Sequence, residues 1–149
     1  MKHIRRAGET DAVRMAEIEV FNYRLNFYPL FRNDAYYFDE LRVDHKAKEY
    51  LNASAAMDAY VYDDGVVKGF IQLDGREIRK LFVEPVLQGG GIGGALLEYA
   101  LRERNANTLW VLEKNERAIA FYQRYGFCIT GERKPEEDTE EYLIRLGRQ

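Results

Sequence analysis

Cysteine is nearly absent from this chain, since Cys128 is the single one among 149 residues. One cysteine cannot form an internal disulfide, so the fold must rest on a hydrophobic core, and a reducing compartment is expected. Histidine is scarce as well: His3 and His45 lie far apart in the sequence with no partner motif, so we expect no metal site. We expect Cys128, which follows Phe127 on a predicted strand, to serve packing rather than catalysis.

Long apolar runs are also missing. Residues 1–9 contain basic side chains with no apolar stretch after them, so we expect neither a signal peptide nor a membrane span, and a cytoplasmic location. The net charge of −3 argues against a surface dedicated to nucleic acid. A content of 46% hydrophobic and 32% charged residues is typical of a folded protein, and this length predicts a single domain over residues 1–149.

Only three prolines occur, and each stands where an element should break. Apolar spacing predicts a helix that Thr10 caps and that runs to about Phe21, a break at Pro29, and later helices at 46–51, 92–104 and 116–124. Alternating patterns predict strands at residues 2–6, 59–62, 66–73, 77–83, 108–112, 127–130 and 141–146. An acidic loop over 132–140 joins the last two strands. This order predicts an α/β (α+β) fold with a mixed, mostly antiparallel central sheet, helices on its flanks and one parallel crossover.

Glycine is concentrated at one point, in the turn Gln88-Gly89-Gly90-Gly91-Ile92-Gly93-Gly94 between a predicted strand and helix. Glycines allow a turn with positive φ and let a ligand approach the backbone closely. The free N–H groups and the dipole of the helix start favour an anion, and a diphosphate is the obvious candidate. A merely flexible loop is disfavoured, because glycines at the start of an amphipathic helix cost stability.

The same turn matches a second pattern, Gly89-x-Gly91-x-x-Gly94, which is typical of dinucleotide binding, with Glu113 roughly 20 residues further on. In that fold the first glycine leaves the strand directly, whereas here residues 84–88 intervene and antiparallel hairpins precede. We therefore disfavour a dinucleotide. A nucleotide-triphosphate loop is excluded because no Gly-Lys-Ser/Thr follows.

With these residues in view, the chain resembles the GNAT superfamily of N-acetyltransferases. The acyl-CoA motif of that family, Gln/Arg-x-x-Gly-x-Gly/Ala after a strand, is similar to Gln88 through Gly93. A second family signature is similar to residues 115–127, and one helix and one strand separate the two. The resemblance implies acetyl-CoA as co-substrate, no metal, and transfer of acetyl to a primary amine of a small molecule or peptide. A non-catalytic acyl-CoA-binding or regulatory module of the same fold is the alternative.

The resemblance also implies roles for single residues. Tyr122 matches the general acid of the family, and Glu77 lies where some members place a catalytic base; Glu84 and Glu113 are weaker candidates for that base. The N–H of Val83 would polarise the thioester carbonyl. The residues implied to contact acyl-CoA are Leu81, Phe82, Val83, Gln88, Gly89, Gly90, Gly91, Ile92, Gly93, Gly94, Asn115, Ala118 and Tyr122.

Structural roles stay open for several of these side chains. Tyr122 is also explained as a core aromatic beside Phe121, and Glu77 as a residue at a hairpin edge. Asn115 is explained nearly as well by a plain N-cap.

The motifs do not specify the acceptor. The aromatic stretch over 21–38, with Asp34, Asp39 and Glu40 interleaved, suits a small cationic or aromatic amine, or else seals the helices onto the sheet. The run 136–138 is acidic and is expected to be a solvated hairpin loop or an acceptor entrance. We expect no nucleic-acid or membrane partner, and both a monomer and a homodimer stay open.

Overall fold

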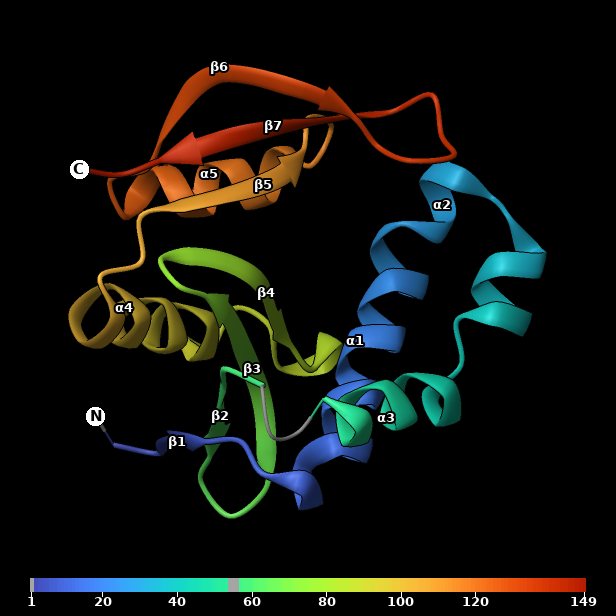
Figure 1. Ribbon diagram of the computed structural model, residues 1–149, viewed down its shortest axis with the longest axis vertical. Helices are drawn as coiled ribbons and strands as arrows, with labels where there is room; N and C mark the ends of the chain where they lie inside the picture. The colour runs from blue at the N-terminus through green and yellow to red at the C-terminus, as the bar shows by residue number, and fades with distance from the viewer. Residues whose placement is uncertain (1, 54–56) are drawn as a thin grey trace.

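The computed structural model describes residues 2–53 and 57–149, and a single seven-stranded sheet runs through it (Figure 1). The strand order is β1-β2-β3-β4-β5-β7-β6, and every neighbouring pair is antiparallel apart from the parallel β4–β5 pair. The prediction of a mostly antiparallel sheet with one parallel crossover is confirmed. The strands are β1 (Ile4–Arg6), β2 (Ala59–Asp63), β3 (Val67–Asp74), β4 (Glu77–Val83), β5 (Thr108–Leu112), β6 (Cys128–Pro135) and β7 (Tyr142–Gly147).

Helices cover both faces of this sheet (Figure 1). They are α1 (Ala12–Asn26), α2 (Tyr28–Phe31), α3 (Val43–Asn52), α4 (Ile92–Arg104) and α5 (Glu116–Arg124), with 3-10 turns at Glu9–Asp11 and Pro85–Leu87 and a π-helical turn at Tyr36–Glu40. Leu96 and Leu97 of α4 and Tyr122 of α5 belong to one buried cluster, whereas Met15 of α1 and Tyr50 of α3 belong to another. The sheet therefore separates an α4–α5 layer from an α1–α3 layer.

The close approach of α4 to the sheet depends on Gly69 in β3. A Cβ at this position would lie 3.0 Å from the carbonyl oxygen of Phe82 and 3.2 Å from side-chain carbons of Ile92 and Leu96. A larger residue would push the helix away from the sheet, and with it the turn that precedes α4.

Helix α1 begins later than the sequence predicts. Its N-cap is Asp11, after a 3-10 turn, so the prediction that Thr10 caps the helix is wrong. The Asp11 carboxylate accepts hydrogen bonds from the Gly8 N–H at 2.8 Å and from the Arg5 guanidinium at 2.9 Å. The guanidinium comes from β1, which is a tertiary partner that local capping patterns do not reveal.

The C-terminal hairpin also differs from the prediction. β6 extends to Pro135, so the acidic loop covers 136–141 rather than 132–140, and Cys128 is exposed rather than packed. A register shift between Ile129 and Arg133 accompanies the positive φ of Gly131. The strand continues past this bulge because Arg133 stacks on the ring of Tyr142 at 3.5 Å and Lys134 on that of Trp110 at 4.2 Å. Among the described residues, no helix combines the length and apolar character needed to cross a membrane.

Candidate functional site

The parallel strand pair opens into a cavity. β4 and β5 are paired only at Glu77–Thr108 and Ile78–Leu109, although β4 continues to Val83 and β5 to Leu112. A cavity of about 940 Å³ occupies the space where the two strands are unpaired, and residues 79–82 and 109–112 line it. The backbone of β4 beyond Ile78 therefore has no partner strand on this side, and its polar groups are free to meet a ligand.

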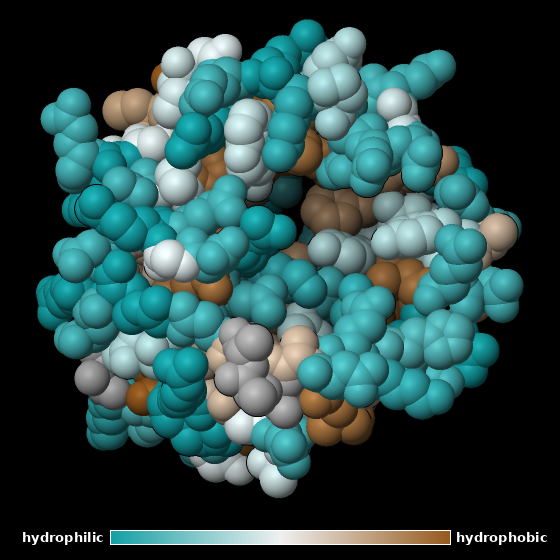
Figure 2. Space-filling model, viewed as in Figure 1, coloured by the Kyte–Doolittle hydropathy of each residue, from teal (hydrophilic) through white to brown (hydrophobic). Residues whose placement is uncertain are grey.

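Three further segments complete the cavity. They are the aromatic residues of α1 and the segment after it, the acidic loop 136–141, and the start of α5. Figure 2 shows the molecule hollowed near its centre, with hydrophobic and hydrophilic side chains side by side at the rim. Mixed walls of this kind are typical of small-molecule sites, in which apolar surface supplies affinity and a few polar groups supply orientation.

The glycine-rich turn lies beyond the end of β4, outside the residues that line this cavity. Gly89 has a φ of 89° and Gly91 a φ of 91°, and a Cβ at either position would meet nothing within 4 Å. These two glycines are therefore required by the backbone rather than by packing, and Gly91 is the N-cap of α4. Gly94 has a different reason, because a Cβ there would clash with the hydroxyl oxygen of Tyr125. Gly93 packs beside the side chains of Val83 and Phe121.

Gln88 and Asn22 fix this turn to the end of β4. The Gln88 side-chain amide donates to Asn22 Oδ1 at 2.8 Å and to the Val83 carbonyl at 3.3 Å. Asn22, which is 3% exposed on α1, donates to the same carbonyl at 2.8 Å and to that of Ile18 at 2.8 Å. Gln88 therefore holds the turn in place. Asn22 was not predicted, because its one signal in the sequence is an amide on the apolar face of a helix.

Tyr122 is a core aromatic residue, which is one of the two descriptions that the sequence left open, and it also lies in the cavity wall. It is 8% exposed, packs edge-on against Phe121 and Phe127, and also lines the cavity. Burial raises the pKa of the Tyr122 phenol well above its ordinary value. The hydroxyl therefore keeps its proton at neutral pH and is available as a donor to a group in the cavity.

The three candidate bases differ in position. Glu77 lines the cavity where the strands part, and its carboxylate is 3.0 Å from the Arg79 guanidinium. Glu84 is paired with Arg14 at 2.9 Å and Glu113 with Arg133 at 3.0 Å, and neither lines the cavity. Of these three carboxylates, Glu77 alone lines the cavity, at the end where β4 and β5 are still paired.

The other predicted contacts divide between cavity and turn. Leu81, Phe82, Asn115 and Ala118 line the cavity with Tyr122, whereas Val83 and the segment 88–94 do not. Asn115 Oδ1 accepts the Ala118 N–H at 3.2 Å, so the residue is an N-cap of α5. The sequence-predicted residues thus form two neighbouring groups, at the open strands and at the start of α4.

A buried charged group on α1 was not predicted. Glu19 is 1% exposed, and its Oε1 accepts from Lys80 Nζ at 2.9 Å and from the Tyr50 hydroxyl. Lys80 Nζ also donates to the Tyr50 oxygen at 3.0 Å, and Lys46 lies 3.6 Å from Oε2. Burial, followed by the Glu19 charge, raises the pKa of Tyr23, a cavity residue one helical turn away. Lys80 lines the cavity, so this network places a fixed polar group in the wall formed by α1 and β4.

Aromatic and acidic residues together line part of the cavity. Five aromatic residues of the 21–38 stretch line it, namely Tyr23, Phe27, Phe31, Tyr36 and Tyr37. Asp34, Asp39 and Glu40 are not among the lining residues, so their predicted role is not supported; the carboxylates come from the 136–141 loop instead. The lining contains six acidic and three basic residues, which makes the cavity attractive to cations. No metal-binding group of three His, Cys, Asp or Glu occurs in the described ranges 2–53 and 57–149.

The fold and this site define an α/β protein in which one parallel pair of strands separates next to a glycine-rich turn at the start of a helix. A family model described as an acetyltransferase (GNAT) domain matches residues 56–129. The chain belongs to the GNAT superfamily.

Named relatives and solved structures agree with this assignment. Peptidyl-lysine N-acetyltransferase YjaB of Escherichia coli (strain K12) is 36% identical over 80 residues, which are 53% of this chain and 54% of that protein. The chain thus spans about half the length of the curated relatives it matches. The solution structure of apo-form YjaB from Escherichia coli has a TM-score of 0.76 at 28% identity and covers 97% of this chain and 95% of that one. PaiA N-acetyltransferase from Thermoplasma acidophilum in complex with coenzyme A is similar in fold, with a TM-score of 0.71 at 18% identity over 95% and 96% of the two chains.

Proposed function

We propose that this protein is an N-acetyltransferase that transfers the acetyl group of acetyl-CoA directly to a primary amine. The observation that carries the proposal is the opened β4–β5 pair next to the glycine turn at the start of α4. An acyl-pantetheine arm fits along the unpaired edge of β4, with the diphosphate at the N–H groups of the α4 start. The complex of the PaiA protein with coenzyme A supports this choice of ligand.

The residues of the turn suit such a ligand. Around Gly89 and Gly91 there is open space, and a left-handed backbone at such positions is the kind that gathers N–H groups into an anion-binding concavity. In the proposal, residues 88–94 bind the diphosphate, Leu81, Phe82 and Val83 run beside the pantetheine, and Asn115 and Ala118 approach it from α5. Gln88 does not need to move when this ligand binds, because its side-chain amide already holds the turn.

The proposed chemistry needs a base and an acid. A lysine-like amine has a pKa near 10.4, so only about one molecule in a thousand is neutral at pH 7. Glu77 accepts the first amine proton through a chain of water, because six residues of β4, about 20 Å, separate it from Val83. The nitrogen then attacks the thioester carbonyl while the Val83 N–H donates to its oxygen, and the second amine proton passes to water. As the C–S bond breaks, Tyr122 gives its proton to the departing thiolate. The position of Tyr122 in the cavity lining supports this role, and its raised pKa keeps the phenol protonated at neutral pH until the thiolate forms.

The proposed acceptor is a cationic amine, either a lysine side chain of a peptide or a small amine. The excess of carboxylates in the cavity lining and the aromatic residues from α1 to the π-helical turn support a cation. The name of the YjaB relatives, peptidyl-lysine N-acetyltransferase, supports the peptide.

A coupled assay tests the proposal. The protein is mixed with acetyl-CoA and a lysine peptide or a polyamine, and both free thiol and acetylated amine are measured. We expect the two products in equal amounts, with kcat about 10²-fold lower in Tyr122→Phe and unchanged CoA affinity. Tyr142→Phe, which alters a tyrosine outside the cavity lining, is the matched control and should keep full activity. CoA binding without thiol release for any acceptor would instead identify a non-catalytic acyl-CoA-binding module.

A further inference from the structure

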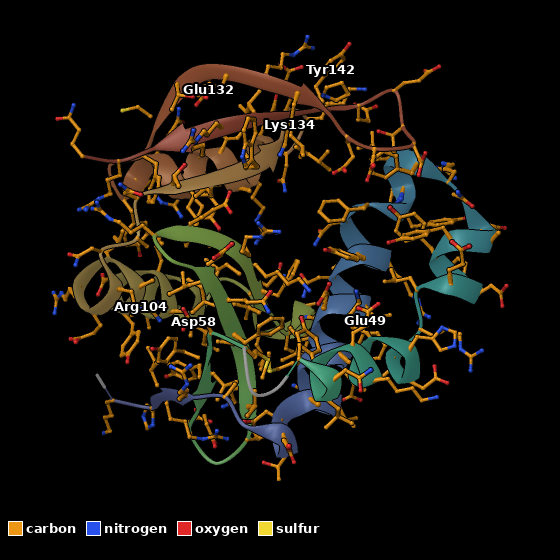
Figure 3. The ribbon with its side chains drawn as sticks, viewed as in Figure 1. Glu49, Asp58, Arg104, Glu132, Lys134 and Tyr142 are labelled. Carbon is orange, nitrogen blue, oxygen red and sulfur yellow. The ribbon has the colours of Figure 1, made fainter. Side chains whose placement is uncertain are left out.

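A lysine of the chain itself lies in the cavity. Lys134 projects from β6 toward β5 across the intervening strand β7, and its Nζ is 4.2 Å from the centroid of the Trp110 ring (Figure 3). Both Lys134 and Trp110 line the cavity together with Tyr122 and Phe82. An ammonium on an aromatic face is the arrangement in which a lysine acceptor would be bound.

The other lysine in the lining is held differently. Lys80 donates to Glu19 at 2.9 Å and to Tyr50 at 3.0 Å, so its ammonium is fixed in the wall. Among the described residues, Lys134 makes neither an ion pair nor a hydrogen bond, and its ammonium is held by the ring alone. Its amine can therefore leave the ring without breaking a charged hydrogen bond.

Strand register places Lys134 opposite the part of the cavity where the acyl group is proposed to lie. Lys134 is paired with Leu143, and Leu143 with Leu112, at the end of β5 beside the unpaired part of β4. Two strand spacings, about 10 Å in total, separate the backbone of Lys134 from that of Leu112. The long side chain already covers much of this distance, since it reaches across β7 to a β5 residue.

We propose that Lys134 is an internal acyl acceptor: the protein acetylates its own Lys134 from acetyl-CoA, within one chain, when no external amine occupies the cavity. This inference rests on the proposed function. The ammonium of Lys134 loses one proton to a carboxylate of the cavity, and its nitrogen attacks the thioester carbonyl. An N–C bond forms, the C–S bond breaks, the second amine proton is lost, and the thiolate takes a proton from Tyr122. The products are an acetylated Lys134 and free CoA.

The proposal is tested by site-resolved mass spectrometry. The protein is incubated with acetyl-CoA alone at two protein concentrations, and acetylation of each lysine is followed over time. Lys114 is the matched reference, because it is 62% exposed, is paired with Glu141 at 2.9 Å and lies outside the lining of the cavity. We expect Lys134 to react at least about tenfold faster than Lys114, at a rate independent of protein concentration. Lys134→Arg should abolish this fast phase, and Lys114→Arg should leave it intact.

Several results would overturn the proposal. Equal rates at Lys134 and Lys114, matching those in the urea-unfolded chain, would mean chemical acetylation of exposed lysines only. A rate at Lys134 that rises with protein concentration would mean transfer between molecules. A lysine peptide assayed in parallel separates the two claims: acetylated peptide with unmodified Lys134 refutes this inference and leaves the proposed function standing. No modification of either the peptide or Lys134 refutes both.

Discussion

Replacing Gly91 by alanine tests whether the glycine turn holds the conformation that the acyl-CoA site needs. Gly91 is the N-cap of α4 with φ 91° and ψ 0°, and an alanine Cβ there would have open space around it. The cost is therefore backbone strain alone, about 1–2 kcal/mol. Gly90 is the matched control, because its backbone lies outside the left-handed region and its Cβ would make an ordinary 3.5 Å contact with the Leu87 carbonyl. Gly90→Ala should stabilise the protein by about 0.4–1 kcal/mol, since it removes freedom from the unfolded chain.

Urea unfolding and CoA titration together measure this cost. If the turn stays left-handed in the free protein, Gly91→Ala lowers the free energy of unfolding by the full 1–2 kcal/mol or so. If the turn relaxes instead, binding must re-form it, and CoA affinity falls by about 5–30-fold. In either case the loss of unfolding free energy and the loss of CoA binding free energy add up to the strain energy of about 1–2 kcal/mol. A Gly91→Ala protein with wild-type stability and wild-type CoA affinity would contradict this prediction, because neither the folded protein nor its CoA complex would then require a left-handed residue at position 91.

Three further predictions concern charge and protonation. Lys80→Met leaves the buried carboxylate of Glu19 without its nearest cation, so urea unfolding should show a loss of about 3–5 kcal/mol; a loss below about 1 kcal/mol would mean that the pair is not buried. Arg5 holds the pKa of Asp11 below its ordinary value, so this carboxylate stabilises the fold at neutral pH and the contribution is lost as pH falls through the folded-state pKa. The Asp11→Asn protein should therefore have a lower free energy of unfolding than wild type at neutral pH, and the two values should converge in acid. A difference in unfolding free energy that stays constant with pH would contradict this. Burial raises the pKa of Tyr122, so its contribution is complete below the ordinary tyrosine pKa and is lost as pH rises through the folded-state value. In thermal unfolding, the Tyr122→Phe protein should accordingly lose less stability than wild type as pH becomes alkaline. Equal losses in the two proteins would argue against a buried phenol.

Local sequence signals predicted most of the strands but not the tertiary contacts between elements. The alternating residues and the glycine turn each act within a few residues, and the structure contains the corresponding elements. The predicted start of α1 was wrong: its N-cap is Asp11, whose carboxylate accepts a hydrogen bond from Arg5 on a different element. The predicted end of β6 was wrong because the strand resumes its pairing with β7 after the bulge at Gly131, up to Pro135 and Tyr142.

The candidate site shows the same division. Tyr122, Asn115 and Leu81 carry motif or strand positions, and the structure brings them to one cavity. Glu19 and Lys80 could not be predicted as a pair, because they are 61 residues apart and meet only where α1 packs against β4. Contacts of this separation are set by the packing of whole elements, which periodicity within one element does not encode.

Titrating isotope-labelled protein with CoA, and following its backbone amide signals, shows directly whether acyl-CoA binds at the glycine turn and β4. We expect saturable shifts at residues 89–94 and 81–83, where the diphosphate and the pantetheine arm are proposed to bind. Signals of β1 and β2, on the far edge of the sheet, should stay in place. Shifts confined to residues away from the glycine turn and β4, or no shifts at saturating CoA, would contradict it.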